Sequence, residues 1–285
     1  MAVLAPWVVL DPMLLDWLRE DIGRGDRTTG SLYIGEATSQ EAQWIAKAPG
    51  AIAGLPVASR IFELLDPNVK FEALVKDGDC CKPGQMVARL VGFPESLLLG
   101  ERVALNLTMR LSGIATLTRK YVEKIADLPV QLVDTRKTTP GLRLFEKYAT
   151  QVGGARNHRL GLDDAVMIKD NHIAAAGGIQ QAIASIQDKI PYPLTIEVET
   201  ETLAQVQEAL AHGADIIMLD NMPPEQMCEA IAQIRQQNPR IKIEASGNIT
   251  LETIRTVAET GVDYISSSAP ITRSPWLDLS MRFKV

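Results

Sequence analysis

The sequence has few cysteines, few histidines and no excess of basic residues, and these shortages exclude several kinds of protein. Its three cysteines, Cys80, Cys81 and Cys228, form no CxxC pair and no metal-ligand spacing with histidine. This pattern argues against a disulfide framework and is typical of a reducing cytosol. With 29 basic and 35 acidic residues, the net charge is −6. The overall field therefore gives no reason to bind nucleic acid or an anionic membrane.

Long apolar runs are also missing. No stretch approaches the ~18 consecutive apolar residues that a membrane span needs. The N-terminus is apolar but lacks a basic region and a clear cleavage site, so it is a weak signal peptide. We therefore expect a soluble cytoplasmic protein with no membrane partner. The 285 residues are 46% hydrophobic, which is enough for a full core and allows one large domain or two.

The first 92 residues mix helix and strand patterns without a regular alternation. Residues 11–22 predict a helix in which Asp11 is the N-cap. Alternating patterns predict strands within 42–54 and 69–92. The turn-rich segment 69–92 is similar to lipoyl and biotinyl carrier domains, but the motif around their modified lysine is absent. We therefore expect a structural sheet there, within an α+β domain.

Beyond a helical stretch from residue 94 to about 127, apolar strands alternate with helices. The strand-like runs are 130–134, 165–169, 194–198, 215–219, 241–245 and 262–266. This alternation predicts βαβ units and a parallel sheet. Short, regular repeats favour a barrel, but the segment is much shorter than the ~250 residues typical of a complete eightfold barrel. We expect an incomplete barrel.

Charged and small residues follow these strands, and the type of residue changes from the earlier strands to the later ones. Functional residues of parallel barrels gather where the strands end. Cations come first, carboxylates next and small residues last: Arg136, Lys137 and Lys169; Glu199 and Asp220; Ser246, Gly247, Ser267 and Ser268. Because the whole protein is acidic, an anion must be held by such a local cluster of bases. We therefore expect an anionic ligand, with Asp134 and Thr135 orienting the bases that follow them.

The last two strand ends predict a phosphate site. Ser246 and Gly247 precede a helix that we expect Thr250 to cap, and small residues let backbone N–H groups approach an oxyanion. Either loop alone is more simply a turn, but the last two loops of a barrel are its usual phosphate site. Glu199 and Asp220 have two equal interpretations: they cap the following helices, or they bind ribose hydroxyls or magnesium.

Cations are densest within residues 153–172. This segment holds Arg156, His158, Arg159, Lys169 and His172. Arginine binds carboxylates and phosphates through two parallel hydrogen bonds. The segment adjoins glycine-containing turns and an apolar strand, so we expect much of its charge to lie near the sheet rather than on an open surface.

Several motifs together resemble the quinolinate phosphoribosyltransferase family. They are "DTRKTTPGLR", "GGARNHRLGLDDAVMIKDNH", "IEVET", "IIMLDN", "EASGNI" and "GVDYIS", in the family's order and spacing, with "EDIGRGDRTT" and "GERVALNLTMRLSGIAT" in the N-terminal half. The resemblance implies an N-terminal α+β domain (1–112) followed by an incomplete, about seven-stranded α/β barrel (113–269). The tail 270–285 would pack on the first domain. It also implies a homodimer, or a hexamer, in which one subunit covers the barrel mouth of another.

The resemblance further implies a pentosyltransferase of de novo NAD biosynthesis. Quinolinate and phosphoribosyl pyrophosphate would give nicotinate mononucleotide, pyrophosphate and carbon dioxide, with Mg²⁺ as cofactor. The implied quinolinate ligands are Arg136, His158, Arg159 and Lys169, with Arg102 from the neighbouring subunit. Lys137 would lie beside both substrates. Glu199 and Asp220 would hold ribose hydroxyls and magnesium and stabilise positive charge on the sugar, while Ser246, Gly247, Ser267 and Ser268 would bind the 5′-phosphate. Ser268 replaces the glycine of the family's "ISxGxLT" loop.

Three alternatives remain at this point. A sister transferase of the same fold would act on another acid, although the dense cations favour a dicarboxylate. A barrel lyase or isomerase acting on a sugar phosphate would use Lys169 as a Schiff-base residue. A carrier or binding module would depend on the 69–92 pattern and would not be an enzyme.

Overall fold

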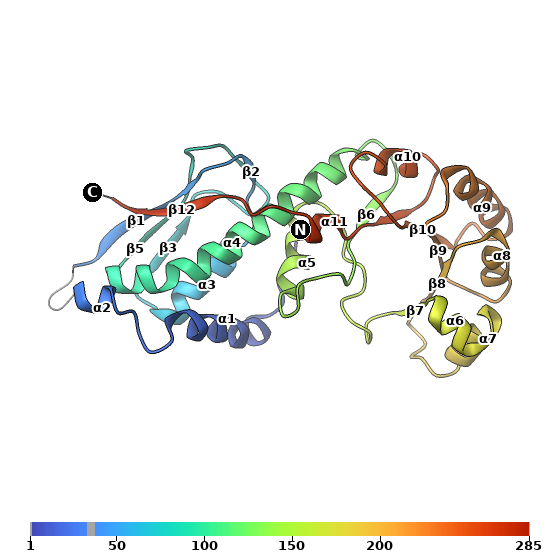
Figure 1. Ribbon diagram of the computed structural model, residues 1–285, viewed down its shortest axis with the longest axis horizontal. Helices are drawn as coiled ribbons and strands as arrows, with labels where there is room; N and C mark the ends of the chain where they lie inside the picture. Colours follow the sequence, from blue (N-terminus) through green and yellow to red (C-terminus); the bar gives the residue numbers. More distant parts are fainter. Residues whose placement is uncertain (1, 33–37, 285) are drawn as a thin grey trace. The chain divides into compact units, whose positions relative to one another are not determined.

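A computed structural model describes residues 2–32 and 38–284. The chain divides into two compact units, whose elements are drawn in Figure 1. The first unit contains residues 1–119, 144–154 and 273–285, and the second contains residues 120–143 and 155–272. Among the described residues, no helix combines the length and the apolar character needed to cross a membrane.

The first unit is built on a four-stranded antiparallel sheet. In spatial order its strands are β12 (Leu279–Phe283), β1 (Gln40–Ala46), β5 (Met86–Gly92) and β3 (Lys70–Ala73). A separate pair joins β2 (Gly50–Ala51) to β4 (Cys80–Cys81). The segment predicted as a structural sheet thus supplies three paired strands. The C-terminal strand β12 pairs with β1, and Trp44 lies opposite Met281.

Five helices lie wholly or largely in the first unit. They are α1 (Trp7–Ile22), α2 (Thr29–Leu32), α3 (Leu55–Leu65), α4 (Pro94–Glu123) and α5 (Arg143–Val152). Helix α1 buries Leu10, Leu14 and Leu18 along one face. The predicted N-cap was wrong, because Pro6 is the N-cap and Asp11 lies inside the helix. The carboxylate of Asp11 instead accepts two hydrogen bonds from the guanidinium of Arg60 (2.9 and 2.6 Å).

The second unit contains a six-stranded, wholly parallel sheet. Its spatial order is β6 (Gln131–Val133), β11 (Tyr264–Ser266), β10 (Lys242–Ser246), β9 (Ile216–Asp220), β8 (Ile196–Thr200) and β7 (Val166–Ile168). All six predicted runs are confirmed as strands. Fully buried residues such as Ile217, Ile243 and Ile265 form its core, as expected for a parallel sheet covered on both faces.

Helices follow most of these strands. They are α6 (Asp170–Ala176), α7 (Ile179–Gln187), α8 (Leu203–Ala211), α9 (Pro224–Gln237), α10 (Ile254–Ala258) and α11 (Ala269–Thr272). Helices α6 to α9 contact one another in sequence along one side of the sheet (Figure 1). This alternation brings the carboxyl ends of all six strands to one edge.

The incomplete α/β barrel is confirmed, with six strands instead of about seven. A single parallel bridge, Val133 to Arg156, stands where a seventh strand would lie beside β6. The ladder stops there because the side chain of Asp134 takes the next donors. It accepts the N–H of His158 (2.9 Å) and the side-chain amide of Asn157 (2.7 Å).

Candidate active site

A pocket of about 310 Å³ lies among the parallel strands, towards their carboxyl ends. We call it the cationic pocket. Its lining residues are Thr135, Arg136, Lys137, His158, Arg159, Met167, Lys169, Met218, Glu244, Ser246 and Ser266. The structure thus gathers most of the predicted cations in one place, although they come from separate segments of the chain.

Arg136 and Lys137 enter this pocket from the loop after β6. Asp134 is buried and binds the backbone of His158, and the hydroxyl of Thr135 accepts the N–H of Lys137 (3.0 Å). Both residues therefore shape the loop, as predicted. Among the described residues, no carboxylate lies within ion-pair distance of Arg136 or Lys137, so both cations are available to a ligand.

Arg159 is a buried cation in the same pocket. It is only 9% exposed, and its guanidinium donates to the carbonyl oxygen of Ala165 (3.0 Å) and to the sulfur of Met167 (3.7 Å). Burial, and then the positive charge of Arg136, lower its pKa. Two guanidinium groups that repel each other in a partly buried space form a strong site for an anion.

Lys169 and Glu199 are joined across the ends of two neighbouring strands. Lys169 follows β7, is the N-cap of α6 and forms an ion pair with Glu199 of β8. The side chain of Lys169 is 40% exposed, whereas that of Glu199 is 13% exposed. The amine of Lys169 thus reaches the cationic pocket, and the carboxylate of Glu199 partly balances its positive charge.

Neither Glu199 nor Asp220 caps a helix. Thr202 is the N-cap of α8 and Pro223 is the N-cap of α9, which removes the capping interpretation for both carboxylates. Asp220 is the last residue of β9, and its carboxylate accepts the side-chain amide of Asn221 (2.7 Å). Both carboxylates stand at the edge of the sheet where the strands end.

The loop after β10 has the tight geometry expected of a phosphate loop. Gly247 has a φ of +97°, and Asn221 and Asn248 also have positive φ angles. The N–H of Asn221 donates to the carbonyl oxygen of Ser246 (2.9 Å), which ties the two loops together. Thr250 accepts the N–H of Thr253 (3.3 Å), but the helix itself begins later than predicted, at Ile254 of α10.

The two serines after β11 have different surroundings from those at 246–247. The Ser267 hydroxyl donates to the carbonyl oxygen of Ile249 (3.4 Å) and accepts the N–H of Ala269 (3.2 Å), and the residue is 6% exposed. Ser268 has no positive φ, so its replacement of a glycine causes no backbone strain. Neither Ser267 nor Ser268 lines the cationic pocket, whereas Ser266, the last residue of β11, does.

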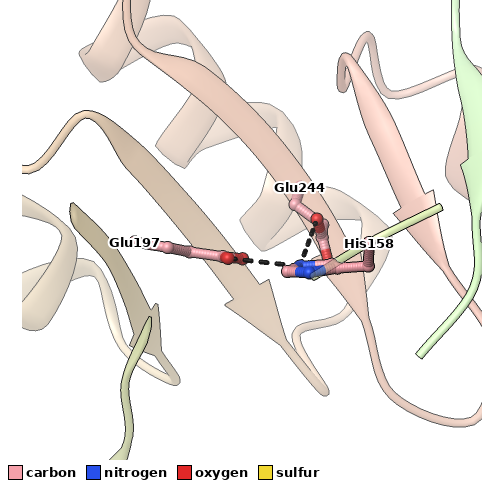
Figure 2. Close-up of side chains that lie close together, drawn as sticks. All are labelled: His158, Glu197 and Glu244. Atoms are coloured by element: carbon pink, nitrogen blue, oxygen red, sulfur yellow. Dashed lines mark ion pairs between the residues drawn. The ribbon is translucent and has the colours of Figure 1, made fainter. Parts of the chain in front are cut away.

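His158, Glu197 and Glu244 form a buried cluster of charges (Figure 2), and two of them, His158 and Glu244, line the pocket. Nε2 of His158 lies 3.2 Å from an oxygen of Glu197 and 3.5 Å from an oxygen of Glu244. These three residues offer ligand atoms within 4.8 Å of one another, an arrangement that could hold a metal ion. Sequence reasoning missed both glutamates, and the signal for them was a charged residue inside each of two apolar strands.

Three cations of the sequence prediction lie outside the cationic pocket. Arg156 lines a different pocket. His172 lies in α6, where its Nδ1 accepts the N–H of Lys169 (3.0 Å). Arg102 belongs to α4 in the first unit. Its side chain is 58% exposed and lies 3.7 Å from the carboxylate of Glu101.

Comparisons with known proteins identify the family of this chain. The model of the quinolinate phosphoribosyl transferase N-terminal domain matches residues 26–112, and that of the C-terminal domain matches residues 114–282. A probable nicotinate-nucleotide pyrophosphorylase (carboxylating) of Synechocystis is 60% identical over 282 residues, covering 99% of this chain and 95% of that protein. A protein of the same description from Bacillus subtilis is 47% identical over 272 residues, covering 95% and 92%.

A solved structure gives the same result. The crystal structure of NadC from Streptococcus pyogenes superimposes with a TM-score of 0.93 at 43% identity, covering 99% of both chains. The two domain models cover nearly the whole chain in the expected order. The chain therefore belongs to the quinolinate phosphoribosyl transferase family.

Proposed function

We propose that the cationic pocket binds quinolinate and that the loops beside it bind the phosphoribosyl donor. By family, the protein is a quinolinate phosphoribosyltransferase, a pentosyltransferase of NAD biosynthesis. Its substrates are quinolinate and phosphoribosyl pyrophosphate. The reaction gives nicotinate mononucleotide, pyrophosphate and carbon dioxide.

One observation carries the assignment of the pocket. Arg136 and Arg159 share a partly buried space, and no carboxylate among the described residues is bound to either guanidinium. Burial, and then the positive charge of Arg136, lower the pKa of Arg159. Quinolinate is a dianion with adjacent carboxylates, so it would relieve that repulsion and accept hydrogen bonds from both arginines. Nicotinate has one carboxylate and would leave part of the positive charge unbalanced.

Lys137, Lys169 and His158 complete this pocket around the substrate. The ammonium group of Lys137 has no ion-pair partner among residues 2–32 and 38–284, and Lys169 presents its amine beside Glu199. We assign Lys137 to the space between the two substrates and Lys169 to a quinolinate carboxylate. His158 lines the pocket, but its Nε2 faces the two buried glutamates and its Nδ1 accepts the N–H of Arg159 (2.7 Å). Its predicted contact with substrate would therefore use the ring or require a shift.

The phosphoribosyl group would lie along the edge formed by β8 to β10. Ser246 and Gly247 offer a tight loop for the 5′-phosphate. Ser268 can add its hydroxyl, whereas Ser267 uses its own inside the protein. Glu199 and Asp220 would accept hydrogen bonds from ribose hydroxyls and stabilise positive charge on the sugar as pyrophosphate leaves.

The chemistry requires positioning more than covalent catalysis. The ring nitrogen of quinolinate attacks the anomeric carbon while pyrophosphate departs, which a fixed arrangement of two bound substrates accelerates. The adduct has a cationic ring, and this ring accepts the electron pair that remains when the adjacent carboxylate leaves as carbon dioxide. Cations that first bind the carboxylates would then lie beside the developing charge.

The donor set at the strand ends fits magnesium in part. Mg²⁺ is usually held by one or two carboxylates together with substrate phosphate oxygens. Asp220 fits this role because, in the part of the chain that the structure describes, its carboxylate is bound only by a side-chain amide. Glu199 can contribute only when its ion pair with Lys169 opens. When bound, the ion would neutralise charge on the departing pyrophosphate.

We further propose a cytoplasmic homodimer with shared active sites. Arg102 is exposed on α4 and has only one carboxylate, Glu101, within 4 Å among the described residues. In a dimer it would reach the cationic pocket of the partner. The three free cysteines are compatible with a reducing compartment.

The proposal is tested by comparing two acids as phosphoribosyl acceptors. The purified protein is incubated with phosphoribosyl pyrophosphate, Mg²⁺ and either quinolinate or nicotinate, and released carbon dioxide and pyrophosphate are measured. We expect equal amounts of both products from quinolinate and no turnover of nicotinate. Pyrophosphate release from nicotinate without carbon dioxide would contradict the proposal.

A further inference from the structure

The hydroxyl of Ser266 is buried in the wall of the cationic pocket without a hydrogen bond. Ser266 is the last residue of β11, is 4% exposed and lines that pocket. Within residues 2–32 and 38–284, its Oγ has no hydrogen-bond partner. Burying a hydroxyl without a partner is unfavourable, and native proteins seldom keep one unless another group satisfies it. This hydroxyl is therefore a candidate contact for a ligand.

The other buried serines and threonines of the described chain all use their hydroxyls. They are Thr29, Thr108, Ser112, Thr118, Thr150, Thr200 and Ser267. Each of these hydroxyls donates a hydrogen bond to a backbone carbonyl oxygen or to a side chain. Ser266 is the exception among these buried residues, and it is also the one that lines the cationic pocket.

The register of the parallel sheet places Ser266 between two parts of the site. Strand β11 lies between β6 and β10. Ser266 pairs with Val133 of β6, and the loop that follows β6 carries Arg136. On the other side, the register with β10 continues to Ser246, which lines the same pocket. The hydroxyl thus lies on the wall between Arg136 and the proposed phosphate loop.

A bound dianion needs more hydrogen-bond donors than the two arginines leave free. This step rests on the proposed function, in which quinolinate occupies the cationic pocket. Each oxygen of its two carboxylates can accept about two hydrogen bonds. The guanidinium of Arg159 already donates to the carbonyl oxygen of Ala165 and to the sulfur of Met167. An uncharged donor in the wall would satisfy a carboxylate oxygen that the guanidinium groups leave unpaired.

The position of Ser266 favours quinolinate over the phosphoribosyl donor as its partner. The donor would lie along the edge formed by β8 to β10, with its phosphate at the loop of Ser246 and Gly247. Strand β11 lies beyond β10 and next to β6, which is the side of the sheet that delivers Arg136. The Ser266 hydroxyl is also buried inside the last turn of the strand rather than in the loop that follows it.

We propose that Ser266 is a substrate-binding residue, whose hydroxyl donates a hydrogen bond to the quinolinate carboxylate that Arg136 binds. Rotation about χ1 moves a serine hydroxyl between staggered positions, so it can turn towards the carboxylate without a change in the backbone. An acid that lacks this carboxylate leaves the hydroxyl buried and unpaired. Ser266 thereby adds to the selection of a dicarboxylate over a monocarboxylate.

Ser266→Ala tests the contact, because it removes the hydroxyl and little else. Steady-state kinetics with each substrate varied in turn gives the two KM values. Hydrogen bonds to a carboxylate are stronger than those between neutral groups. We expect the KM for quinolinate to rise at least about tenfold, or about 1.4 kcal/mol, while the KM for phosphoribosyl pyrophosphate stays within about twofold. An equal rise in both values, or no rise in either, would overturn the proposal.

Ser280→Ala is the matched control. The Oγ of Ser280, in β12 of the first unit, is also buried without a hydrogen-bond partner in the described part of the chain. Ser280 is not among the residues that line the cationic pocket. Its substitution removes the same group from a similar environment and should change neither KM. A rise in the KM for quinolinate as large as that of Ser266→Ala would overturn the proposal.

Thermal unfolding without substrates separates binding from a structural role. Since the Ser266 hydroxyl makes no hydrogen bond in the free protein, Ser266→Ala should unfold at the wild-type temperature or above it. A lower unfolding temperature would assign the hydroxyl to the structure of the protein and overturn the proposal. If wild type did not turn over quinolinate, the proposed function itself would fail. Turnover by wild type with an unaffected Ser266→Ala variant would overturn only the role of Ser266.

Discussion

A Cβ atom on Gly247 would lie 2.1 Å from the side-chain oxygen of Asn221. The two residues belong to loops that follow neighbouring strands, β10 and β9, and the contact leaves room only for glycine. Both residues also have positive φ angles. The close approach of Asn221 to Gly247 therefore fixes the shape of the proposed phosphate loop, and a substitution at Gly247 tests its importance.

Gly247→Ala should weaken binding of phosphoribosyl pyrophosphate. The substitution adds a steric clash to a φ that costs about 1–3 kcal/mol for a residue with a side chain. We expect the KM for this substrate to rise at least about tenfold, or about 1.4 kcal/mol, with a smaller change for quinolinate. Gly261→Ala is the matched control, because its φ is +95° but nothing lies within 4 Å of the new Cβ. An equal effect of the two variants would count against the loop.

Arg136→Ala should weaken binding of quinolinate rather than of the sugar donor. Loss of a buried arginine–carboxylate contact costs about 2–5 kcal/mol. Steady-state kinetics with each substrate varied in turn measures the two KM values. The exposed Arg240→Ala should leave both unchanged. Equal increases in both KM values for Arg136→Ala would refute its role.

Arg102→Ala should be rescued in mixed dimers. If Arg102 serves the pocket of its partner, a chain carrying Arg102→Ala and a chain carrying Arg136→Ala together form one intact site per dimer. We expect mixing after partial unfolding and refolding to restore activity that neither variant has alone. Absence of rescue at every mixing ratio would argue against shared sites.

Asp220→Asn should increase the requirement for magnesium. The amide keeps the size of the side chain but is a much poorer ligand for Mg²⁺ than a carboxylate. Titration of activity with Mg²⁺ should give a half-saturating concentration raised roughly tenfold, or about 1.4 kcal/mol. Asp215→Asn is no suitable control because that carboxylate accepts the N–H of Ile196; the exposed Glu225→Gln on α9 serves instead. An unchanged magnesium requirement would show that residues other than Asp220 hold the ion.

The six parallel strands could be predicted because each is a short apolar run with a helix between most of them. The count of about seven strands came from the family resemblance, and the described residues have only the single bridge at Arg156 in the seventh place. The start of α1 was predicted too late in the sequence because aspartate is a residue type that often caps helices. Only the fold shows that Arg60 binds it.

The site was predictable where charges follow strands and unpredictable where they lie inside them. Glu197 and Glu244 lie inside β8 and β10, where His158, from a distant loop, lies between them. The serines after β11 illustrate a second limit. Successive residues of a strand face opposite sides, so an uncertainty of one position decides whether Ser266 or Ser267 faces the pocket.

We propose above all that the cationic pocket binds quinolinate through Arg136 and Arg159. A crystal structure of the protein with quinolinate tests it most directly. The account predicts that the two carboxylates contact Arg136 and Arg159, with the ring nitrogen turned towards the edge that carries Glu199 and Asp220. Quinolinate bound elsewhere, or in this pocket without contact to either arginine, would contradict it.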